Sequence, residues 1–445
     1  MLILSMCIAV VQVLVRAMES MNSQSQSMTV DELLQDVGID LLTLSNADHY
    51  SWIRLLNCEV LGEAYITLLK STIDALLQSD WTTCHRKCKV LLDITWEHLY
   101  SGHWKDIDIS TRHAYTLVSL LKVVSEFAQC GDLYSMKDVI YTCDMGLLMG
   151  APLLNNILAR LATKLQQLYT DSCSASDTDT VRTGQQNAEH VDQDHNQLLC
   201  GSKVATEACP SLEYFSEVYV STGTPVILRN CMDDWPAMSH NRWSPQYMRK
   251  VAGCRLVPVE LGSKYTDQSW SQKLMTVEDF FENYVDGNGG ERPKEVAYLA
   301  QHQLFNQVPR LRQDIIVPDY CALSACGDDE ESEVDINAWF GPSGTVSPLH
   351  RDEKRNVFAQ VVGAKYIRLY HPDMTYGLYP HSSHLLSTTS QVDVEDPDMT
   401  AFPLFEGVTF SDCVLHEGDM LYIPPMYWHF IRSLATSFSV SFWWT

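Results

Sequence analysis

The spacing of hydrophobic residues changes near the middle of the chain. Between residues 29 and 170 apolar side chains recur three and four positions apart, which is the spacing of one face of an α-helix. Pro152 suits the first turn of one such helix, and Thr29 and Glu32 have the spacing of a capping box. The clearest stripe comprises Leu117, Leu120, Leu121, Val124 and Phe127. We predict about six to eight helices in an irregular bundle, without a repeat of fixed period.

Beyond residue 200 short strands and turn residues become frequent. Residues 200–333 mix strands with helices, and the chain from 334 onward shows almost only strands. Serines alternate with apolar residues from Ser437 to Phe442, so this strand should have one polar and one apolar face. The predicted strands are Val334–Phe340, Val357–Val362, Lys365–Tyr370, Asp419–Ile423, His429–Leu434 and Ser437–Trp444. Many short strands joined by turns predict an antiparallel barrel or jelly roll, so the fold class is α+β.

Two stretches of different composition complete the predicted domain organisation. Residues 171–199 are polar and almost without aliphatic side chains, which favours a disordered linker. Residues 1–28 begin with an apolar run that is short for a membrane span and lacks the basic start of a signal peptide. We therefore expect a leader over 1–28, a helical domain over 29–170, the linker over 171–199 and a second domain over 200–445.

Charge and cysteine content narrow the possible partners. The chain has 31 Lys and Arg against 56 Asp and Glu, a net charge of −25. Such a chain is a poor binder of nucleic acid or of anionic membranes, so we expect neither partner. The charge suits a basic polypeptide substrate, and solubility alone would explain it equally well. The 14 cysteines show no disulfide framework, and the one tight pair, Cys84 and Cys88, has no second pair at zinc-site spacing.

A histidine followed two positions later by an acidic residue is a weak metal motif, because about two are expected by chance in a chain of this composition. The chain holds three, and they begin at His190, His350 and His371. The first lies in the predicted linker and the third in a turn without an evident partner. Only the motif of His350 and Asp352 precedes strong strands and has a further candidate ligand, His429, at the start of another strand.

These residue types suit iron chemistry. Two histidines and one carboxylate on one face of a metal leave three positions open, which is the arrangement of non-haem Fe(II) oxygenases. A 2-oxoglutarate cosubstrate could chelate such an iron and leave a position for O2. Its distant carboxylate needs a buried cation, and Lys365 on the following strand could supply it. Hydrogen bonds to the same carboxylate could come from Tyr298, Ser347 and Asn356. The alternative is a pair of ordinary core histidines beside a surface aspartate.

Three stretches of the chain carry a family resemblance: NAWFG at residue 337, SPLHRDEKRNVFAQVVGAKYIRLY at 347, and GDMLYIPPMYWHF near the end. They resemble the JmjC-domain Fe(II)/2-oxoglutarate oxygenases, and within these the protein arginyl hydroxylases. The resemblance covers roughly 200–445 and implies a cupin-type double-stranded β-helix with flanking helices. It implies His350, Asp352 and His429 as catalytic iron ligands. For 2-oxoglutarate it implies Tyr298, Ser347, Asn356, Lys365 and Trp443.

The substrate is less well indicated. A carboxylate beside an aromatic face suits a guanidinium, which makes Glu260 and Trp270 candidate substrate contacts and Gln301 a weaker one. The resemblance implies hydroxylation of arginine at C3 in a protein substrate, with 2-oxoglutarate converted to succinate and CO2. The alternatives are demethylation of N-methyl-lysine on histones, a histone-tail protease, and a non-catalytic interaction protein. The resemblance also implies a chromatin regulator in the nucleus, and a cytoplasmic location stays open.

Overall fold

A computed structural model describes most of the chain. The described residues are 56–102, 106–131, 133–176, 195–262, 264, 270–286, 295–323, 333–383 and 386–445. The predicted leader, the capping box at Thr29 and residues 177–194 of the predicted linker lie outside this set. The chain forms two compact units, the first comprising 1–179, 251–256 and 307–309 and the second comprising the rest. No described helix is both long enough and apolar enough to cross a membrane.

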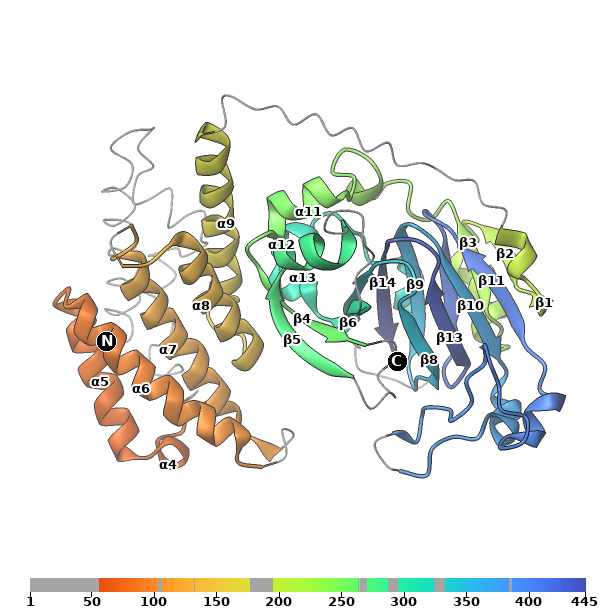
Figure 1. Ribbon diagram of the computed structural model, residues 1–445, viewed down its shortest axis with the longest axis horizontal. Coiled ribbons are helices and arrows are strands. Elements are labelled where there is room, and N and C mark those ends of the chain that lie inside the picture. Colours follow the sequence, from red (N-terminus) through yellow and green to blue (C-terminus); the bar gives the residue numbers. More distant parts are fainter. Residues whose placement is uncertain are drawn as a thin grey trace. The chain divides into compact units, whose positions relative to one another are not determined.

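The first unit is built from helices that pack each against the next along the chain (Figure 1). They are α4 (Cys58–Leu61), α5 (Glu63–Leu77), α6 (Trp81–Tyr100), α7 (Ile109–Phe127), α8 (Met136–Met149) and α9 (Ile157–Ser176). At several of these helices, a side chain that accepts backbone hydrogen bonds fixes the start. Asp80 caps α6, Asp108 caps α7, and Ser135 with Asp138 forms a capping box on α8. Helical periodicity therefore predicted this unit correctly.

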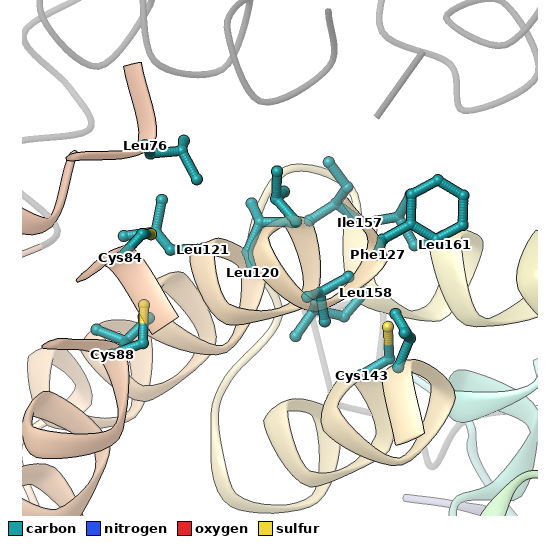
Figure 2. Close-up of a cluster of buried hydrophobic side chains, with 14 of the residues drawn as sticks. Leu76, Cys84, Cys88, Leu120, Leu121, Phe127, Cys143, Ile157, Leu158 and Leu161 are labelled. Carbon is teal, nitrogen blue, oxygen red and sulfur yellow. The ribbon is translucent and has the colours of Figure 1, made fainter. Parts of the chain in front are cut away.

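Helix α7 is the centre of this unit's core, since most of its residues are buried, including Leu120, Leu121 and Phe127. Figure 2 shows Cys84 and Cys88 among the leucine side chains of the core, and both are fully buried. A hydrogen bond from Cys84, together with burial, raises the pKa of the Cys88 thiol well above its usual value. Metals bind the thiolate form of cysteine, which a raised pKa disfavours. We therefore assign this pair to the core and not to a metal site.

The predicted start of α9 is wrong by several residues. Pro152 does not open the helix, which begins at Ile157. Three residues before it, Leu154, Asn155 and Asn156, adopt left-handed backbone angles, with φ of 52°, 52° and 56°. Asparagine tolerates this conformation better than most residues do. The leucine spacing of the helix continues backward into this turn, and periodicity alone could not distinguish the two.

The second unit contains two sheets that face each other (Figure 1). The smaller sheet has the order β1-β11-β10-β13-β8, and the larger has β2-β3-β12-β9-β14-β7-β6-β4-β5. Most neighbours are antiparallel, and β1–β11 and β2–β3 are parallel pairs. Apolar side chains from both sheets form a shared core, with Phe358 and Leu421 from the larger sheet and Ile367 and Ile431 from the smaller. This is the predicted double-stranded β-helix.

The bounds of its strands are β1 (Ser202–Lys203), β2 (Ala205–Ala208), β3 (Val226–Arg229), β4 (Leu256–Leu261), β5 (Ser271–Thr276), β6 (Ala297–His302), β7 (Asp335–Gly341), β8 (Val346–Arg351), β9 (Arg355–Val362), β10 (Lys365–Tyr370), β11 (Ser411–Leu415), β12 (Met420–Ile423), β13 (Trp428–Ser433) and β14 (Ser437–Trp444). Short helices flank them: α10 (Leu212–Phe215), α11 (Pro245–Ala252), α12 (Val277–Phe280), α13 (Leu304–Gln307) and α14 (Pro309–Arg312). The six strands predicted from residue 334 onward are all present, but β8 and β11 were not predicted.

Strand β14 has the predicted bounds, but its serine face is buried. Ser437, Ser439 and Ser441 are fully buried, because β14 lies between β7 and β9 within the larger sheet. Gln360 bonds the first two serines, at 2.7 and 2.8 Å, and Trp339 Nε1 donates to Ser441 at 2.9 Å. Alternation therefore identified the strand, whereas a polar face need not be a solvent-exposed face when its hydroxyls find partners.

Candidate metal and cosubstrate site

The two histidines of the predicted metal site lie side by side on adjacent strands. His350 on β8 is the register partner of His429 on β13, and their ring centroids are 4.2 Å apart. Asp352 follows the end of β8, and its Oδ2 lies 3.6 Å from His429 Nε2. One nitrogen or oxygen atom from each of the three residues lies within 4.8 Å of the other two. Among the described residues this is the one group of three that could hold a metal ion in this way.

Backbone carbonyls fix the orientation of both imidazole rings. His350 Nδ1 lies 2.7 Å from the Pro348 carbonyl oxygen, and His429 Nδ1 lies 3.0 Å from that of Tyr427. A carbonyl oxygen only accepts, so in each ring Nδ1 carries the proton and Nε2 keeps its lone pair. Burial, and then the neighbouring His350, lower the pKa of His429 to about 4. The low pKa keeps the His429 ring neutral, and in both rings the carbonyl contact at Nδ1 leaves Nε2 as the nitrogen that can bind a divalent metal.

Lys365 lies at the start of β10, beside β13, and its ammonium group is fully buried. Its Nζ donates to the Tyr298 hydroxyl at 2.9 Å and lies 5.2 and 5.3 Å from the ring centres of Tyr298 and Phe358. None of the ion pairs found among the described residues includes Lys365. Burial lowers the pKa of Lys365 to about 7. A buried cation with only hydroxyl and aromatic partners is a site for an anion.

Four of the five predicted cosubstrate residues line one pocket between the sheets. The fifth, Lys365, does not line it but donates to Tyr298, which does. Asn356 on β9 is the register partner of Trp443 on β14, while Tyr298 comes from β6 and Ser347 from β8. The pocket is lined by Tyr298, Trp339, Ser347, His350, Asp352, Asn356, Phe358, His429, Ile431 and Trp443. The structure therefore brings together the three candidate metal ligands and the hydrogen-bonding residues that the sequence suggested for 2-oxoglutarate.

Several polar atoms of this pocket have no hydrogen-bond partner in the protein. They are Asp352 Oδ2, Asn356 Oδ1 and Trp443 Nε1, and all are buried. Buried polar atoms are rarely left without partners, so these atoms indicate a bound group. A carboxylate beside two oriented imidazoles fits Fe(II), and a buried ammonium together with the partnerless Trp443 Nε1 donor fits a small dicarboxylate. The residues present thus fit the iron and 2-oxoglutarate that the resemblance implied.

The other two histidine motifs differ from this site. His371 caps the short helix Pro372–Leu378 by accepting a hydrogen bond from the Asp373 backbone nitrogen at 3.2 Å, and both side chains are well exposed. The motif that begins at His190 lies outside the described residues.

The three predicted substrate contacts do not line the pocket. Glu260 on β4 is the register partner of Tyr298, the residue whose hydroxyl contacts Lys365. Trp270 Nε1 donates to Glu260 at 3.2 Å, so the carboxylate and the indole form the pair that the sequence suggested. Burial raises the pKa of Glu260. Gln301 is exposed, with φ of 47°, where the β6–β7 register shifts.

Three lining residues were missing from the sequence-based set: Trp339, Phe358 and Ile431. Two of them had a usable signal. Phe358 follows Asn356 by two positions on the same strand, and Ile431 follows His429 in the same way, so period-two alternation places each on its neighbour's face. Trp339 had no such signal, because its place depends on the pairing of β7 with β14.

Comparison with known proteins agrees with this geometry. A model of the Cupin-like domain matches residues 211–445, and a model of KDM8-like N-terminal ARM repeats matches 79–179. The sequence showed no repeat of fixed period, so it did not establish a solenoid, whereas the second match identifies ARM repeats in the helical region. Helices that pack each on the next are typical of stacked repeats, and so few units leave no readable period.

Three relatives show how much of the chain is shared. Lysine-specific demethylase 8 of Danio rerio is 45% identical over 83% of this chain and 89% of its own length. Lysine-specific demethylase JMJ30 of Arabidopsis thaliana is 40% identical over 79% and 84%. Jumonji C domain-containing protein 5 of Drosophila melanogaster is 35% identical over 80% and 85%. The chain belongs to the JmjC family of cupin-fold 2-oxoglutarate-dependent dioxygenases.

More particularly, it carries a KDM8-like helical region before the cupin domain and aligns over about four fifths of its length with these relatives. The family uses Fe(II), 2-oxoglutarate and O2, so the predicted cofactors are confirmed. Two of these relatives are named lysine-specific demethylases, which favours the demethylase alternative over the arginine hydroxylase that the sequence resemblance put first.

Proposed function

We propose that this chain oxidises a carbon–hydrogen bond in a cationic side chain of a protein substrate. The observation that carries the proposal is a pocket lined by an oriented His-Asp-His group and by Tyr298, whose hydroxyl contacts the buried Lys365 ammonium group. When bound, Fe(II) and 2-oxoglutarate supply the oxidising chemistry, with 2-oxoglutarate converted to succinate and CO2.

In this proposal His350, Asp352 and His429 would hold the iron, with both imidazole rings oriented by backbone carbonyls. Lys365 binds the distant carboxylate of 2-oxoglutarate, supported by the Tyr298 hydroxyl. Ser347, Asn356 and Trp443 offer hydrogen bonds around the same molecule. The apolar walls, which include Phe358 and Ile431, exclude water from this space and strengthen the charge-assisted bonds inside it.

Demethylation of N-methyl-lysine is the first candidate reaction, because relatives over four fifths of this chain bear the name lysine-specific demethylase. Hydroxylation of an N-methyl carbon gives a hemiaminal, which releases formaldehyde and leaves the shortened amine. A methylated ammonium is a cation, and the half-buried Glu260 carboxylate near the pocket suits it. A histone tail is the kind of basic substrate that a chain of charge −25 would attract. The proposal includes a nuclear location.

Hydroxylation of arginine at C3 is the second candidate, and the geometry at Glu260 favours it. Trp270 holds the Glu260 carboxylate through its indole nitrogen, so a carboxylate and an aromatic face lie together. A guanidinium pairs with the first and stacks on the second. A peptidase activity has one support, a relative named bifunctional peptidase and (3S)-lysyl hydroxylase JMJD7, which is 25% identical over 53% of this chain.

Mass spectrometry of peptides distinguishes these reactions. The purified protein is incubated with Fe(II), ascorbate, 2-oxoglutarate and paired peptides that differ only in carrying arginine or N-methyl-lysine. Loss of one methyl group supports demethylation, one added oxygen on arginine supports hydroxylation, and backbone cleavage supports the peptidase. The control is Asp352→Ala with the same peptides. A protein that binds Fe(II) and 2-oxoglutarate but forms no succinate with any peptide would exclude both candidate reactions and favour an interaction protein.

Glu260→Ala tests the substrate contact separately. The side chain does not line the metal pocket, so the affinity for 2-oxoglutarate should stay unchanged. We expect the KM for the peptide to rise about tenfold, the effect of losing one charge-assisted contact. His371→Ala is the matched surface control. An unchanged peptide KM would remove Glu260 from the substrate site.

A further inference from the structure

A pair of cysteines lies at the edge of the larger sheet, away from the residues of the metal pocket. Cys209 directly follows β2, and Cys231 lies two residues beyond β3. Figure 1 shows β2 and β3 side by side. The two Sγ atoms are 3.8 Å apart, which is van der Waals contact. Both residues belong to the second unit, and no role in the proposed oxygenase reaction falls to either of them.

The backbone brings these two thiols together. Strands β2 and β3 are parallel, with Ala208 opposite Arg229, and the Cys209 backbone nitrogen donates to the Arg229 carbonyl at 3.0 Å. Cys209 and Asn230 both have left-handed backbone angles, with φ of 47° and 61°. A left-handed cysteine is uncommon, and such conformations are kept where the surrounding structure demands them. The two turns direct both thiols to the same side.

The two thiols differ in their accessibility to solvent, so they should differ in how readily they are oxidised. Cys209 is exposed, so a dissolved oxidant can reach it. Cys231 is half-buried, and its Sγ lies 3.3 Å from the Arg229 carbonyl oxygen and 3.8 Å from the Tyr320 hydroxyl. Burial raises the pKa of the Cys231 thiol to about 11. Cys209 is therefore the thiol that reacts first, and Cys231 the one that resolves the product.

We propose that Cys209 and Cys231 form a reversible disulfide when the protein meets hydrogen peroxide. The Cys209 thiolate attacks the peroxide, the O–O bond breaks, and a sulfenic acid and hydroxide result. The Cys231 sulfur then attacks the sulfenic sulfur, so that an S–S bond forms, the S–O bond breaks and water leaves. In total two thiols are oxidised and one peroxide is reduced to two waters.

The other close thiol pair shows why position matters. Cys84 and Cys88 hydrogen-bond to each other one turn apart on α6, but both are fully buried in the helical core. Peroxide has no access to them while the unit is folded. They are an internal control for the Cys209 and Cys231 pair, because closeness without exposure should leave them reduced.

The disulfide would join two neighbouring segments of the sheet edge. Strand β3 pairs with β12, and β12 pairs with β9, which carries Asn356. A bond across residues 209–231 would restrict the unfolded chain and so stabilise this edge. For a loop of this length we expect Tm to rise by about 5 °C or more on oxidation.

Peptide mapping tests the proposal directly, because trypsin cuts between the two cysteines. Residues 204–229 contain only Cys209, and residues 230–242 contain only Cys231. The full-length protein is reduced, treated with hydrogen peroxide, alkylated and digested. We expect these two peptides joined with the loss of two hydrogens, and separated again by a thiol reductant. Peptides with Cys84 and Cys88 should be alkylated only after unfolding.

Three variants complete the experiment. With Cys231→Ser the linked peptide should disappear and dimedone should trap a sulfenic acid on Cys209, whereas Cys209→Ser should give neither product. Cys200→Ser, which removes another exposed thiol, should keep the linked peptide and the rise in Tm. Recovery of the two peptides unlinked from folded, peroxide-treated protein would overturn the proposal. A linked peptide without a change in Tm would overturn the predicted stabilisation.

Discussion

The two units bury charged side chains in opposite ways. In the helical unit the buried Glu126 carboxylate accepts hydrogen bonds from Thr142 at 2.6 Å and pairs with Lys122 at 2.9 Å and His85 at 3.2 Å. In the sandwich the buried Lys365 ammonium has the Tyr298 hydroxyl and two aromatic rings around it. One charge is neutralised within the fold, and the other is left without a counter-charge from the described chain.

This difference separates residues that stabilise from residues that bind. Burying a charge is costly unless a partner compensates it. Lys122, His85 and Thr142 compensate the buried charge of Glu126, so this group needs no ligand and can act in stability alone. The charge of Lys365 and the partnerless atoms of Asp352 and Asn356 are compensated only when a bound group supplies their partners. The following predictions test this contrast, in order of decreasing effect.

Loss of a metal ligand should have the largest effect. His350→Ala or Asp352→Ala should lower 2-oxoglutarate turnover more than about 1000-fold and abolish iron binding, because two ligands hold the metal poorly. Succinate formation and iron titration measure the two effects. Tm without iron should stay within about 3 °C, since neither side chain completes a buried ion pair. His371→Ala is the control with the same motif, and it should change nothing. Survival of activity in Asp352→Ala would place the iron elsewhere.

Removal of the buried lysine should have the next largest effect. Lys365→Met should raise the 2-oxoglutarate concentration required for half-maximal turnover about 100-fold, because a charge-assisted contact is lost. The same change should leave Tm of the cosubstrate-free protein equal or higher, since it removes an uncompensated buried charge. Titration calorimetry and thermal unfolding measure the two effects. A clear fall in stability with unchanged 2-oxoglutarate affinity would make Lys365 a structural residue.

The paired charge of the helical unit should behave in the opposite way. Glu126→Gln should lower the free energy of unfolding by about 2 kcal/mol, because Lys122 and His85 lose their partner. Affinity for 2-oxoglutarate should not change. Chemical denaturation and calorimetry on the same preparation test both statements. A neutral effect on stability would show that the Glu126 group is not the compensated charge that its distances indicate.

The smallest effect concerns pH. Burial lowers the pKa of Lys365 to about 7, and only its charged form attracts a carboxylate. Affinity for 2-oxoglutarate should therefore be constant below about pH 7 and fall as pH rises, approaching tenfold per unit between pH 8 and 9. Lys365→Met should remove this dependence. Direct binding of 2-oxoglutarate, measured with a redox-inert divalent metal in place of iron, avoids effects of pH on turnover.

Much of this protein could be predicted from the sequence because the relevant signals are local. Helical spacing identified α7 and alternation identified β14. The predicted linker 171–199 begins too early, because α9 continues to Ser176. Residue types suggested His350, Asp352, His429 and Lys365. The structure places the first three in one pocket, which Tyr298 also lines. Signals also failed in two other places, at a strand whose pairing partner is distant in sequence and at a local turn that interrupts helical spacing. Strand β8, which carries His350, was not predicted, and the start of α9 was placed in a left-handed turn.

The sequence by itself determined the class of chemistry, since it supplied two histidines, a carboxylate and a lysine in a region of short predicted β-strands. The sequence already favoured the motif of His350 over that of His371, and the tertiary structure shows what brings the third candidate ligand to it. His350 and His371 have the same local pattern, but β13 lies beside β8 and brings His429 to His350. Only the tertiary structure decided that the serines of β14 are buried and that Lys365 has no counter-charge from the described chain. These outcomes depend on strand pairing between residues far apart in the chain, which no local pattern encodes.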